Sequence, residues 1–354
     1  MRVFISFDME GVAGIVDWSQ CRPPGQPYEE GRRLLLGEVN AAIDGALAAG
    51  ATEIICNDSH GAMNNLDPAA LHGRAAYVAG RHKPLYMMQG MDSSVDAVFL
   101  VGYHGSISGE GSVLSHTYNP SVISRVALNG TECGESGINA LVALACQAPV
   151  ALVTGDQHTI AQGEPFLKGA GQVIVKDSIT RFAAAQLHPL EARERIAAGA
   201  EEALNRLASI PLPSITLPAR LDVEMQTADM AEVAGWAKGV ERDGTRSVLI
   251  EGDDPLEVFR SFVALTYITR QAEGRSLALS RLGRCCLTCR CPGCACCRCP
   301  GHVAAVTCPA SGTRQPGWPG RPKRPRRQPR RGRPRSAGSA RRRSPRSRLS
   351  RLVS

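Results

Sequence analysis

Short apolar segments that end abruptly in polar residues recur along the first half of the chain. Such continuous apolar runs are typical of strands buried in the interior of a sheet. The predicted strands are residues 3–7, 53–56, 76–78, 95–102, 122–128, 150–154 and 172–175. Asn129-Gly130 directly follows one of them and predicts a tight hairpin turn.

Segments with apolar residues at helical spacing lie between these strands. Residues 28–49 carry apolar side chains three or four positions apart, and Gly50 stands where a glycine commonly ends a helix. Residues 134–146 and 189–208 are two further predicted helices. A strand, a helix and a second strand within about 55 residues are typical of a βαβ unit, so we predict parallel strands.

The pattern changes after residue 214. Apolar and polar residues alternate over 221–225 and part of 246–251, while 228–236 and 255–270 show helical spacing. We therefore predict an α/β fold with a mainly parallel central sheet flanked by helices, followed by a smaller C-terminal α+β lobe. The expected divisions are an α/β domain at 1–212, the lobe at 213–275 and a tail at 276–354.

The charge of the chain divides sharply near residue 280. Residues 281–354 hold 20 of the 41 Lys and Arg and none of the 33 Asp and Glu, so this segment carries +20. The first 280 residues hold 21 basic against 33 acidic residues and carry −12. The formal net charge of +8 describes neither part, and we expect an acidic globular body with a separate basic tail.

The tail is rich first in cysteine and then in arginine, proline and serine. Nine of the 13 cysteines lie between Cys285 and Cys308, including the pairs Cys286-x-x-Cys289 and Cys291-x-x-Cys294. One residue separates the pairs, whereas zinc folds keep their ligand pairs much further apart, so we expect no structured metal site there. The basic remainder is expected to be disordered. Its composition favours an accidental origin, such as a shifted reading frame in a GC-rich gene, over an arm that binds nucleic acid.

Several features indicate a reducing compartment. Met1-Arg2 leads directly into the first predicted strand and leaves no room for a signal peptide. No apolar run reaches the length of a membrane span. The four cysteines of the body are scattered rather than arranged as a disulfide framework. We therefore expect a cytoplasmic protein without membrane association.

Residues that bind divalent metals follow three of the predicted strands. Asp8 and Glu10 come after the first strand, Asp58 and His60 after the second, and His104 after the strand at 95–102. The carboxyl ends of parallel strands share one edge of the sheet, where ligands bind. Two neighbouring carboxylates repel each other unless a cation lies between them, so this edge is a candidate metal site.

Glu135 and His116 can join this group. Glu135 stands in the first turn of a predicted helix, whose dipole is expected to keep its carboxylate ionised. With it, two histidines and three carboxylates suit zinc or a similar cation and suffice for two metals that share a carboxylate. His116 lies twelve residues past His104 and is a candidate base or nucleophile. Each residue alone is more often a capping, core or surface residue, and only their coincidence indicates a site.

Six short motifs, in their order and spacing, resemble those of the DppA-type zinc D-aminopeptidases across roughly residues 1–270. They are Ser6-Phe7-Asp8-Met9-Glu10-Gly11, Asn57-Asp58-Ser59-His60, Met63-Asn64-Asn65-Leu66, Gly102-Tyr103-His104, Ser115-His116 and Gly134-Glu135-Ser136-Gly137-Ile138-Asn139-Ala140. The resemblance implies that Asp8, Glu10, His60, His104 and Glu135 hold two zinc ions per subunit and that His116 is catalytic. It also implies removal of an N-terminal D-residue, typically D-alanine, from short peptides by a ring-shaped homo-oligomer, a decamer, with its active sites facing an inner chamber.

The predicted chemistry is metal-assisted amide hydrolysis, in which zinc polarises the scissile carbonyl and acidifies a water molecule. His116 would move a proton or stabilise the oxyanion. Two alternatives stay open: a metallohydrolase of another small amide or ester, and a nucleic-acid-binding protein with a basic tail on a degenerate scaffold. The intact set of ligand and base candidates argues against the second alternative.

Overall fold

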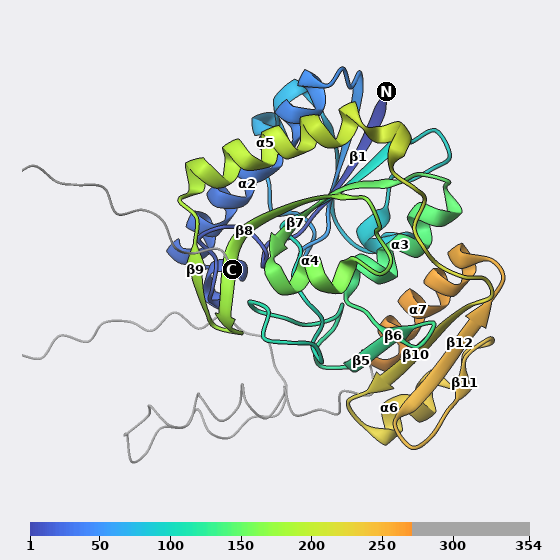
Figure 1. Ribbon diagram of the computed structural model, residues 1–354. Helices are drawn as coiled ribbons and strands as arrows, with labels where there is room; N and C mark the ends of the chain where they lie inside the picture. Colours follow the sequence, from blue (N-terminus) through green and yellow to red (C-terminus); the bar gives the residue numbers. More distant parts are fainter. Residues whose placement is uncertain (271–354) are drawn as a thin grey trace, which may run out of the picture. The chain divides into compact units, whose positions relative to one another are not determined.

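The computed structural model describes residues 1–270 of the 354-residue chain (Figure 1). The predicted tail, with its cysteine pairs and basic segment, lies outside the described residues. Within them the chain forms a seven-stranded sheet in the order β3-β2-β1-β4-β7-β8-β9 and a five-stranded sheet in the order β11-β12-β10-β5-β6.

The seven-stranded sheet is parallel except at one edge, where β9 runs antiparallel to β8. The predicted α/β fold with a mainly parallel central sheet is confirmed. The strands of this sheet are β1 (Arg2–Phe7), β2 (Glu53–Asp58), β3 (Ala76–Val78), β4 (Ala97–Val101), β7 (Val150–Asp156), β8 (Gly171–Thr180) and β9 (Ala183–Gln186).

β1 lies inside this sheet, between β2 and β4. Its side chains alternate, so that Val3, Ile5 and Phe7 enter one hydrophobic core and Phe4 enters the other. All four are fully buried. A strand covered on both faces has no exposed side, which explains why the run is apolar throughout instead of alternating with polar residues.

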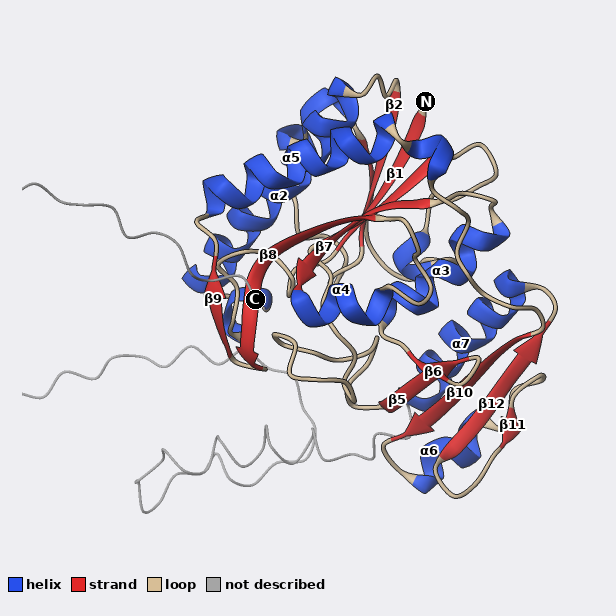
Figure 2. Ribbon diagram, viewed as in Figure 1, coloured by secondary structure: helices blue, strands red, loops and turns tan. Residues whose placement is uncertain are grey.

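Helices cover both faces of the sheet (Figure 2). α2 (Gln26–Ala48) and α5 (Pro189–Asn205) lie side by side and pack on the core that contains Val3, Ile5 and Phe7. α3 (Glu135–Ala145) and α4 (Gln157–Gly163) contribute to the core on the opposite face. The central sheet therefore holds its strand ends rigidly between two layers of helices.

The five-stranded sheet is antiparallel, and α6 (Ala228–Ala234) and α7 (Pro255–Thr269) pack against it. Its strands are β5 (Ile123–Leu128), β6 (Thr131–Glu132), β10 (Ala219–Met225), β11 (Glu241–Arg242) and β12 (Ser247–Gly252). β5 and β6 come from a segment that the sequence analysis places in the first domain. They join the lobe because β5 pairs with β10, a contact between distant segments that local sequence does not show.

Local features agree with the predictions in most places. The turn at Asn129-Gly130 joins β5 to β6, and both residues have the positive φ that this turn requires, 51° and 79°. Gly50 ends α2 with a φ of 88°. The pattern missed α1 (Trp18–Cys21), α4, β6, β9, β11 and four 3₁₀ turns, all of which are short. The 3₁₀ turns are η1 (Pro68–Ala70), η2 (His72–Arg74), η3 (Tyr86–Met88) and η4 (Leu207–Ser209). Every helix among residues 1–270 is too short or too polar to span a bilayer.

Candidate metal centre

Three neighbouring strands of the parallel sheet end at the same edge and deliver the candidate ligands there. Asp8 follows β1 directly, His60 comes two residues after β2, and His104 comes three residues after β4. Because the sheet order is β2-β1-β4, these side chains meet around the end of β1. Glu135 enters the same space from the first residue of α3. The structure thus brings Asp8, His60, His104 and Glu135 together at this edge, as the sequence analysis predicted.

Asp8, Glu10 and His60 form one compact group. Nδ1 of His60 lies 3.1 Å from Oδ1 of Asp8 and 3.0 Å from Oε2 of Glu10. The exposed fractions of these three residues are only 3%, 1% and 7%. Their ligand-type atoms lie within 4.8 Å of one another, a separation at which a single cation can contact all three.

Asp8, His104 and Glu135 form a second group. Nε2 of His104 lies 3.5 Å from Oδ2 of Asp8 and 3.5 Å from Oε2 of Glu135. Both Nε2 of His104 and Oε2 of Glu135 are buried without a hydrogen-bond partner among residues 1–270. Asp8 directs one carboxylate oxygen to each group, so it is the shared member.

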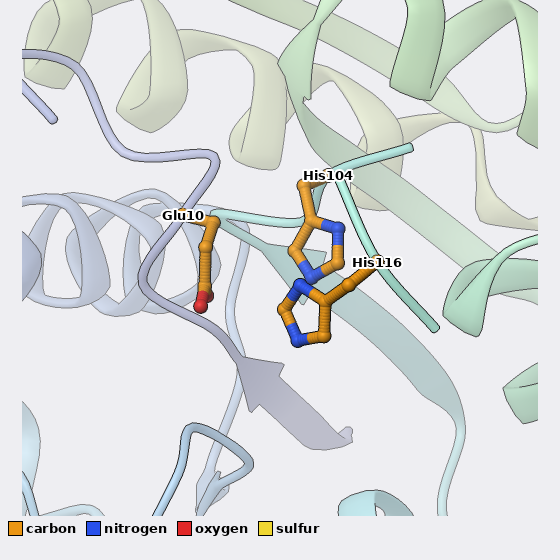
Figure 3. Close-up of side chains that lie close together, drawn as sticks. All are labelled: Glu10, His104 and His116. Carbon is orange, nitrogen blue, oxygen red and sulfur yellow. The ribbon is translucent and has the colours of Figure 1, made fainter. Parts of the chain in front are cut away.

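His116 lies beside the second group, with its ring stacked on that of His104 at 4.2 Å and 16° (Figure 3). Nε2 of His116 lies 3.9 Å from Oε1 of Glu135. Ligand-type atoms of Glu10, His104 and His116 also come within 4.8 Å of one another. The geometry alone therefore allows His116 to act either as a ligand or as a proton carrier beside the metals.

Each of the three histidines donates one ring N–H to a backbone carbonyl. The accepting carbonyls are those of Cys21, Gly105 and Leu114, at 2.8, 2.9 and 3.0 Å from His60, His104 and His116 respectively. A carbonyl oxygen can only accept, so the nitrogen that faces it carries the proton. In the neutral ring the other nitrogen then presents its lone pair to the centre, which is how metal-binding histidines are commonly oriented.

The electrostatics of the two groups are those of a site that lacks positive charge. Burial opposes charge on His104, but Glu135, Asp8 and Glu10 outweigh it and raise the pKa of His104 to about 10. Burial raises the pKa of Glu135 to about 8. The expectation that the helix start keeps Glu135 ionised is therefore wrong for the metal-free chain, because desolvation exceeds the effect of the dipole.

His116 shifts in the opposite direction. Burial and the neighbouring His104 lower the pKa of His116 to about 4, so its ring is neutral at pH 7. Nδ1 of that neutral ring carries the proton donated to the Leu114 carbonyl. Nε2 is consequently an unprotonated acceptor, and the low pKa makes the ring a weak base while the neighbouring His104 is protonated.

The residues present fit zinc. Zinc prefers imidazole nitrogen and carboxylate oxygen, and the centre supplies both in two groups of three. The unpartnered atoms of His104 and Glu135 converge on one point, although a buried polar atom without a partner is costly. A divalent cation between these atoms would satisfy both and supply the missing positive charge.

Asp58, which the sequence analysis considered beside His60, has a different environment. Its carboxylate accepts hydrogen bonds from the backbone and side chain of Asn65 at 2.6 and 2.8 Å, and from Tyr77 Oη at 2.7 Å. None of the metal-capable groups found within residues 1–270 includes Asp58. Asp58 therefore holds the loop that carries His60 in place and is not itself a candidate ligand.

Lys176 is a buried residue beside the candidate ligands that the sequence analysis missed. It lies on β8, is 1% exposed, and donates from Nζ to the carbonyls of Glu10, Val12 and Ile15 at 2.6, 2.8 and 2.8 Å. The buried carboxylate of Glu38 accepts a backbone N–H of the same loop at 2.8 Å. Together they fix loop 8–15, which carries two of the candidate ligands. The signal in the sequence was a lysine directly after the apolar run of a buried strand.

The segment that carries His116 has an unusual backbone. Leu114 and Tyr118 have positive φ values of 50° and 56°, which side chains with a Cβ rarely adopt. Contacts on both sides hold them there: the Leu114 N–H donates to the Arg181 carbonyl at 2.8 Å, and the Tyr118 N–H donates to Oε1 of Glu135 at 2.7 Å. Backbone strain of this kind is often found at functional sites, and His116 lies between the two strained residues.

Glycines allow the strand ends to approach each other behind the centre. A Cβ on Gly11 would collide with the Tyr103 carbonyl, and a Cβ on Gly102, whose φ is 70°, would collide with the carbonyl of Asp8. The Gly11 N–H donates to the Gly102 carbonyl at 2.8 Å across this contact. The turn after β1 is therefore tied directly to the turn after β4.

A cavity of about 440 Å³ opens onto the centre. The buried carboxylates and His60 line its inner end, and exposed arginines, among them Arg81 and Arg270, line its outer part. Pockets for small ligands typically enclose about 300–1,000 Å³. The space is suitable for a short peptide.

Comparison with known proteins identifies the family. A family model described as D-aminopeptidase matches residues 1–264. The D-aminopeptidase of Bacillus subtilis (strain 168) is 32% identical over 268 residues, which cover 75% of this chain and 97% of that protein. The solved structure of the Zn-dependent D-aminopeptidase DppA from Bacillus subtilis, described as a self-compartmentalizing protease, matches with a TM-score of 0.73 at 29% identity, over 77% of this chain and 99% of that chain. The chain therefore belongs to the D-aminopeptidase family and is an aminopeptidase, a hydrolase of peptide bonds.

Proposed function

We propose that the chain is a zinc-dependent D-aminopeptidase with a two-metal centre. The observation that carries this proposal is the pair of three-residue groups that share Asp8, one with Glu10 and His60 and the other with His104 and Glu135. A carboxylate that faces two ligand groups with different oxygens is the arrangement that a bridging ligand requires. Zinc, rather than another metal, follows from the mixed nitrogen and oxygen donors and from the zinc dependence of the structural relative.

The proposed roles follow from the positions of the side chains. Asp8, Glu10, His60, His104 and Glu135 hold the metals, and zinc bound there would supply Lewis-acid polarisation of the scissile carbonyl and a lowered pKa for water. His116 acts as the general base, because its Nε2 is an unprotonated acceptor that faces the centre. A neutral His116 whose proton is on Nδ1 has no N–H at Nε2, so it could not donate a hydrogen bond from Nε2 to an oxyanion.

The substrate is a short peptide with an N-terminal D-residue, on the basis of family membership and the size of the cavity. The chain acts as a homo-oligomer, by analogy with the self-compartmentalizing relative, and we propose that this is a decamer. A reducing cytoplasmic setting suits its four described cysteines, all of which are free thiols.

A direct assay tests the function. Purified full-length protein should hydrolyse D-alanine p-nitroanilide, and should hydrolyse the L-alanine compound far more slowly. A chelator should abolish the activity, and added zinc should restore it. Chelator-sensitive hydrolysis of other amides or esters, without hydrolysis of the D-alanine compound, would favour the alternative metallohydrolase. A complete absence of bound metal in protein never exposed to chelator would contradict the two-metal centre.

A further inference from the structure

A row of three tyrosines leads outward from the metal centre along the wall of the cavity. The backbone N–H of Tyr118 donates to Oε1 of Glu135 at 2.7 Å, which fixes the inner end of the row. The ring of Tyr118 stacks on that of Tyr86 at 5.1 Å, and Tyr86 meets Tyr267 edge to face at 5.8 Å. All three tyrosines line the cavity. The distances between these rings therefore give the length of the path from a candidate ligand to the outer part of the cavity.

Two arginines lie at the outer end of this row. Arg81 and Arg270 line the same cavity and are exposed to solvent. Burial raises the pKa of the Tyr86 phenol, while the positive charges of Arg270 and Arg81 act in the opposite direction. Burial also raises the pKa of Tyr267 against the same two charges. Both guanidinium groups are thus close to the last two rings of the row.

Neither of these two arginines forms an ion pair with another residue among those that the structure describes. The ion pairs found among residues 1–270 include neither Arg81 nor Arg270. Arg22, another arginine of the cavity, is placed differently, with its guanidinium 4.5 Å above the ring of Trp18. The Tyr267 hydroxyl oxygen is shielded from solvent and has no hydrogen-bond partner within the described residues. Two guanidinium groups and one hydroxyl group therefore line this part of the cavity, and none of them has an anionic partner among residues 1–270.

The separation of the two ends matches a short peptide. Two ring-to-ring steps of 5.1 and 5.8 Å lie between Tyr118, which contacts Glu135, and Tyr267. An extended peptide advances at most about 3.3–3.6 Å per residue, so about three residues are needed to cover a path of this length. The inner end holds the carboxylates of the metal groups, and the outer end holds the arginines. A peptide with a free amine at one end and a free carboxylate at the other has the complementary charges.

We propose that Arg81 and Arg270, assisted by the Tyr267 hydroxyl, bind the C-terminal carboxylate of the substrate. The inference rests on the proposed function and narrows its substrate class to short peptides of about three residues with a free C-terminal carboxylate. Guanidinium groups suit this task because their N–H groups form two parallel hydrogen bonds to one carboxylate. The subsite lies away from the reacting bond and contributes equally to the bound substrate and its transition state, so its effect belongs in KM.

The test compares two peptides that differ only in this charge. D-Ala-L-Ala-L-Ala with a free carboxylate and its C-terminal amide are assayed with the zinc-loaded full-length protein, and KM and kcat are determined separately. The variants are Arg81→Gln, Arg270→Gln, the double variant and Tyr267→Phe. Arg33→Gln serves as the matched control, because Arg33 is an exposed arginine of α2 that does not line this cavity.

The wild type should prefer the free acid through a lower KM. Each arginine variant should raise the KM for the acid about tenfold, the scale of a hydrogen bond to a charged group, and leave the KM for the amide and both kcat values unchanged. The double variant should treat the two peptides alike. Equal KM values for acid and amide in the wild type, or variants that weaken both peptides equally, would overturn the subsite alone. Failure to hydrolyse either peptide would overturn the proposed function and the subsite with it.

Discussion

At the scale of single residues, Asp8 belongs to both of the proposed metal groups, and its two oxygens face different groups. Asp8→Ala should therefore release both metals, whereas His60→Ala should release one and leave the other group intact. Metal analysis of the two purified variants beside the wild type, which should hold about two zinc per chain, measures this difference. If Asp8→Ala retained one tightly bound zinc, Asp8 would not be the bridging ligand.

His116 lies close enough to the candidate ligands to bind a metal, and its proposed role as a proton carrier is tested by substitution. His116→Ala should keep its zinc and lose roughly 10²–10⁴-fold in kcat, the usual scale for a general base. His72→Ala is the matched control, since His72 pairs with Asp44 on the surface. Zinc content and kcat for substrate are measured on both variants. Loss of zinc together with activity would make His116 a ligand.

The raised pKa values of His104 and Glu135 predict how zinc binding depends on pH. Their values of about 10 and about 8 mean that both are protonated at neutral pH in the zinc-free chain. Those protons must leave before the atoms can bind zinc, so zinc affinity should rise as pH increases from about 6 to about 8. Calorimetric titration of zinc in buffers of different ionisation enthalpy should detect proton release. Binding without proton release would contradict the assigned ligands.

At the scale of elements, Lys176 links β8 to the loop after β1. Lys176→Met removes three hydrogen bonds to the backbone of loop 8–15 while keeping the aliphatic length of the side chain. The fold should persist, and zinc affinity should fall by about 10–100-fold, as when other supports of metal ligands are removed. Competition with a chromogenic chelator measures the affinity, and Lys168→Met, at an exposed position, is the control. Unchanged affinity would reduce Lys176 to a packing role.

The elements show how far local sequence can predict this molecule. The strands before Asp8, His60 and His104 were predictable, because apolar runs and their polar ends are local signals. So was their meeting at one edge, which follows from parallel pairing. The reach of Lys176 across the sheet and the pairing of β5 with β10 were not predictable, since both join segments far apart in the chain. The ionisation of Glu135 was also mispredicted, because burial raises its pKa and the burial of a side chain cannot be seen in local sequence.

At the scale of the whole molecule, the family match ends at residue 264 and the described cavity ends at Arg270. Truncation after residue 275 should therefore leave zinc content and kcat/KM unchanged, and should improve solubility by removing nine cysteines. If the oligomer forms through residues 1–270, the truncated protein should still elute from a sizing column as a large assembly. A drop in kcat/KM, or elution as a monomer when the full chain is oligomeric, would assign a role to the removed segment.

The metal groups also join parts of the fold that are distant in sequence. Their ligands come from residues 8 to 135 and from the ends of three strands and one helix. A cation that binds only the folded chain stabilises it by RT ln(1 + [L]/Kd), which is about 2.7 kcal/mol when the ligand is at a hundredfold excess over Kd. Chelation should accordingly lower the Tm, and scanning calorimetry with and without zinc measures the shift. An unchanged Tm would mean that zinc contributes little to the fold.

The shared Asp8 also has a consequence for the lifetime of the protein inside a cell. With the metals removed, His104 and Glu135 take up protons, and no cation links the strand ends and the helix start that carry the ligands. A chain in that state should open more often and be degraded sooner by cellular proteases, because turnover follows the population of open forms. Supply of metal would then set how many copies persist as well as how many are active. Cells short of zinc would lose this aminopeptidase by degradation rather than store it in an inactive form.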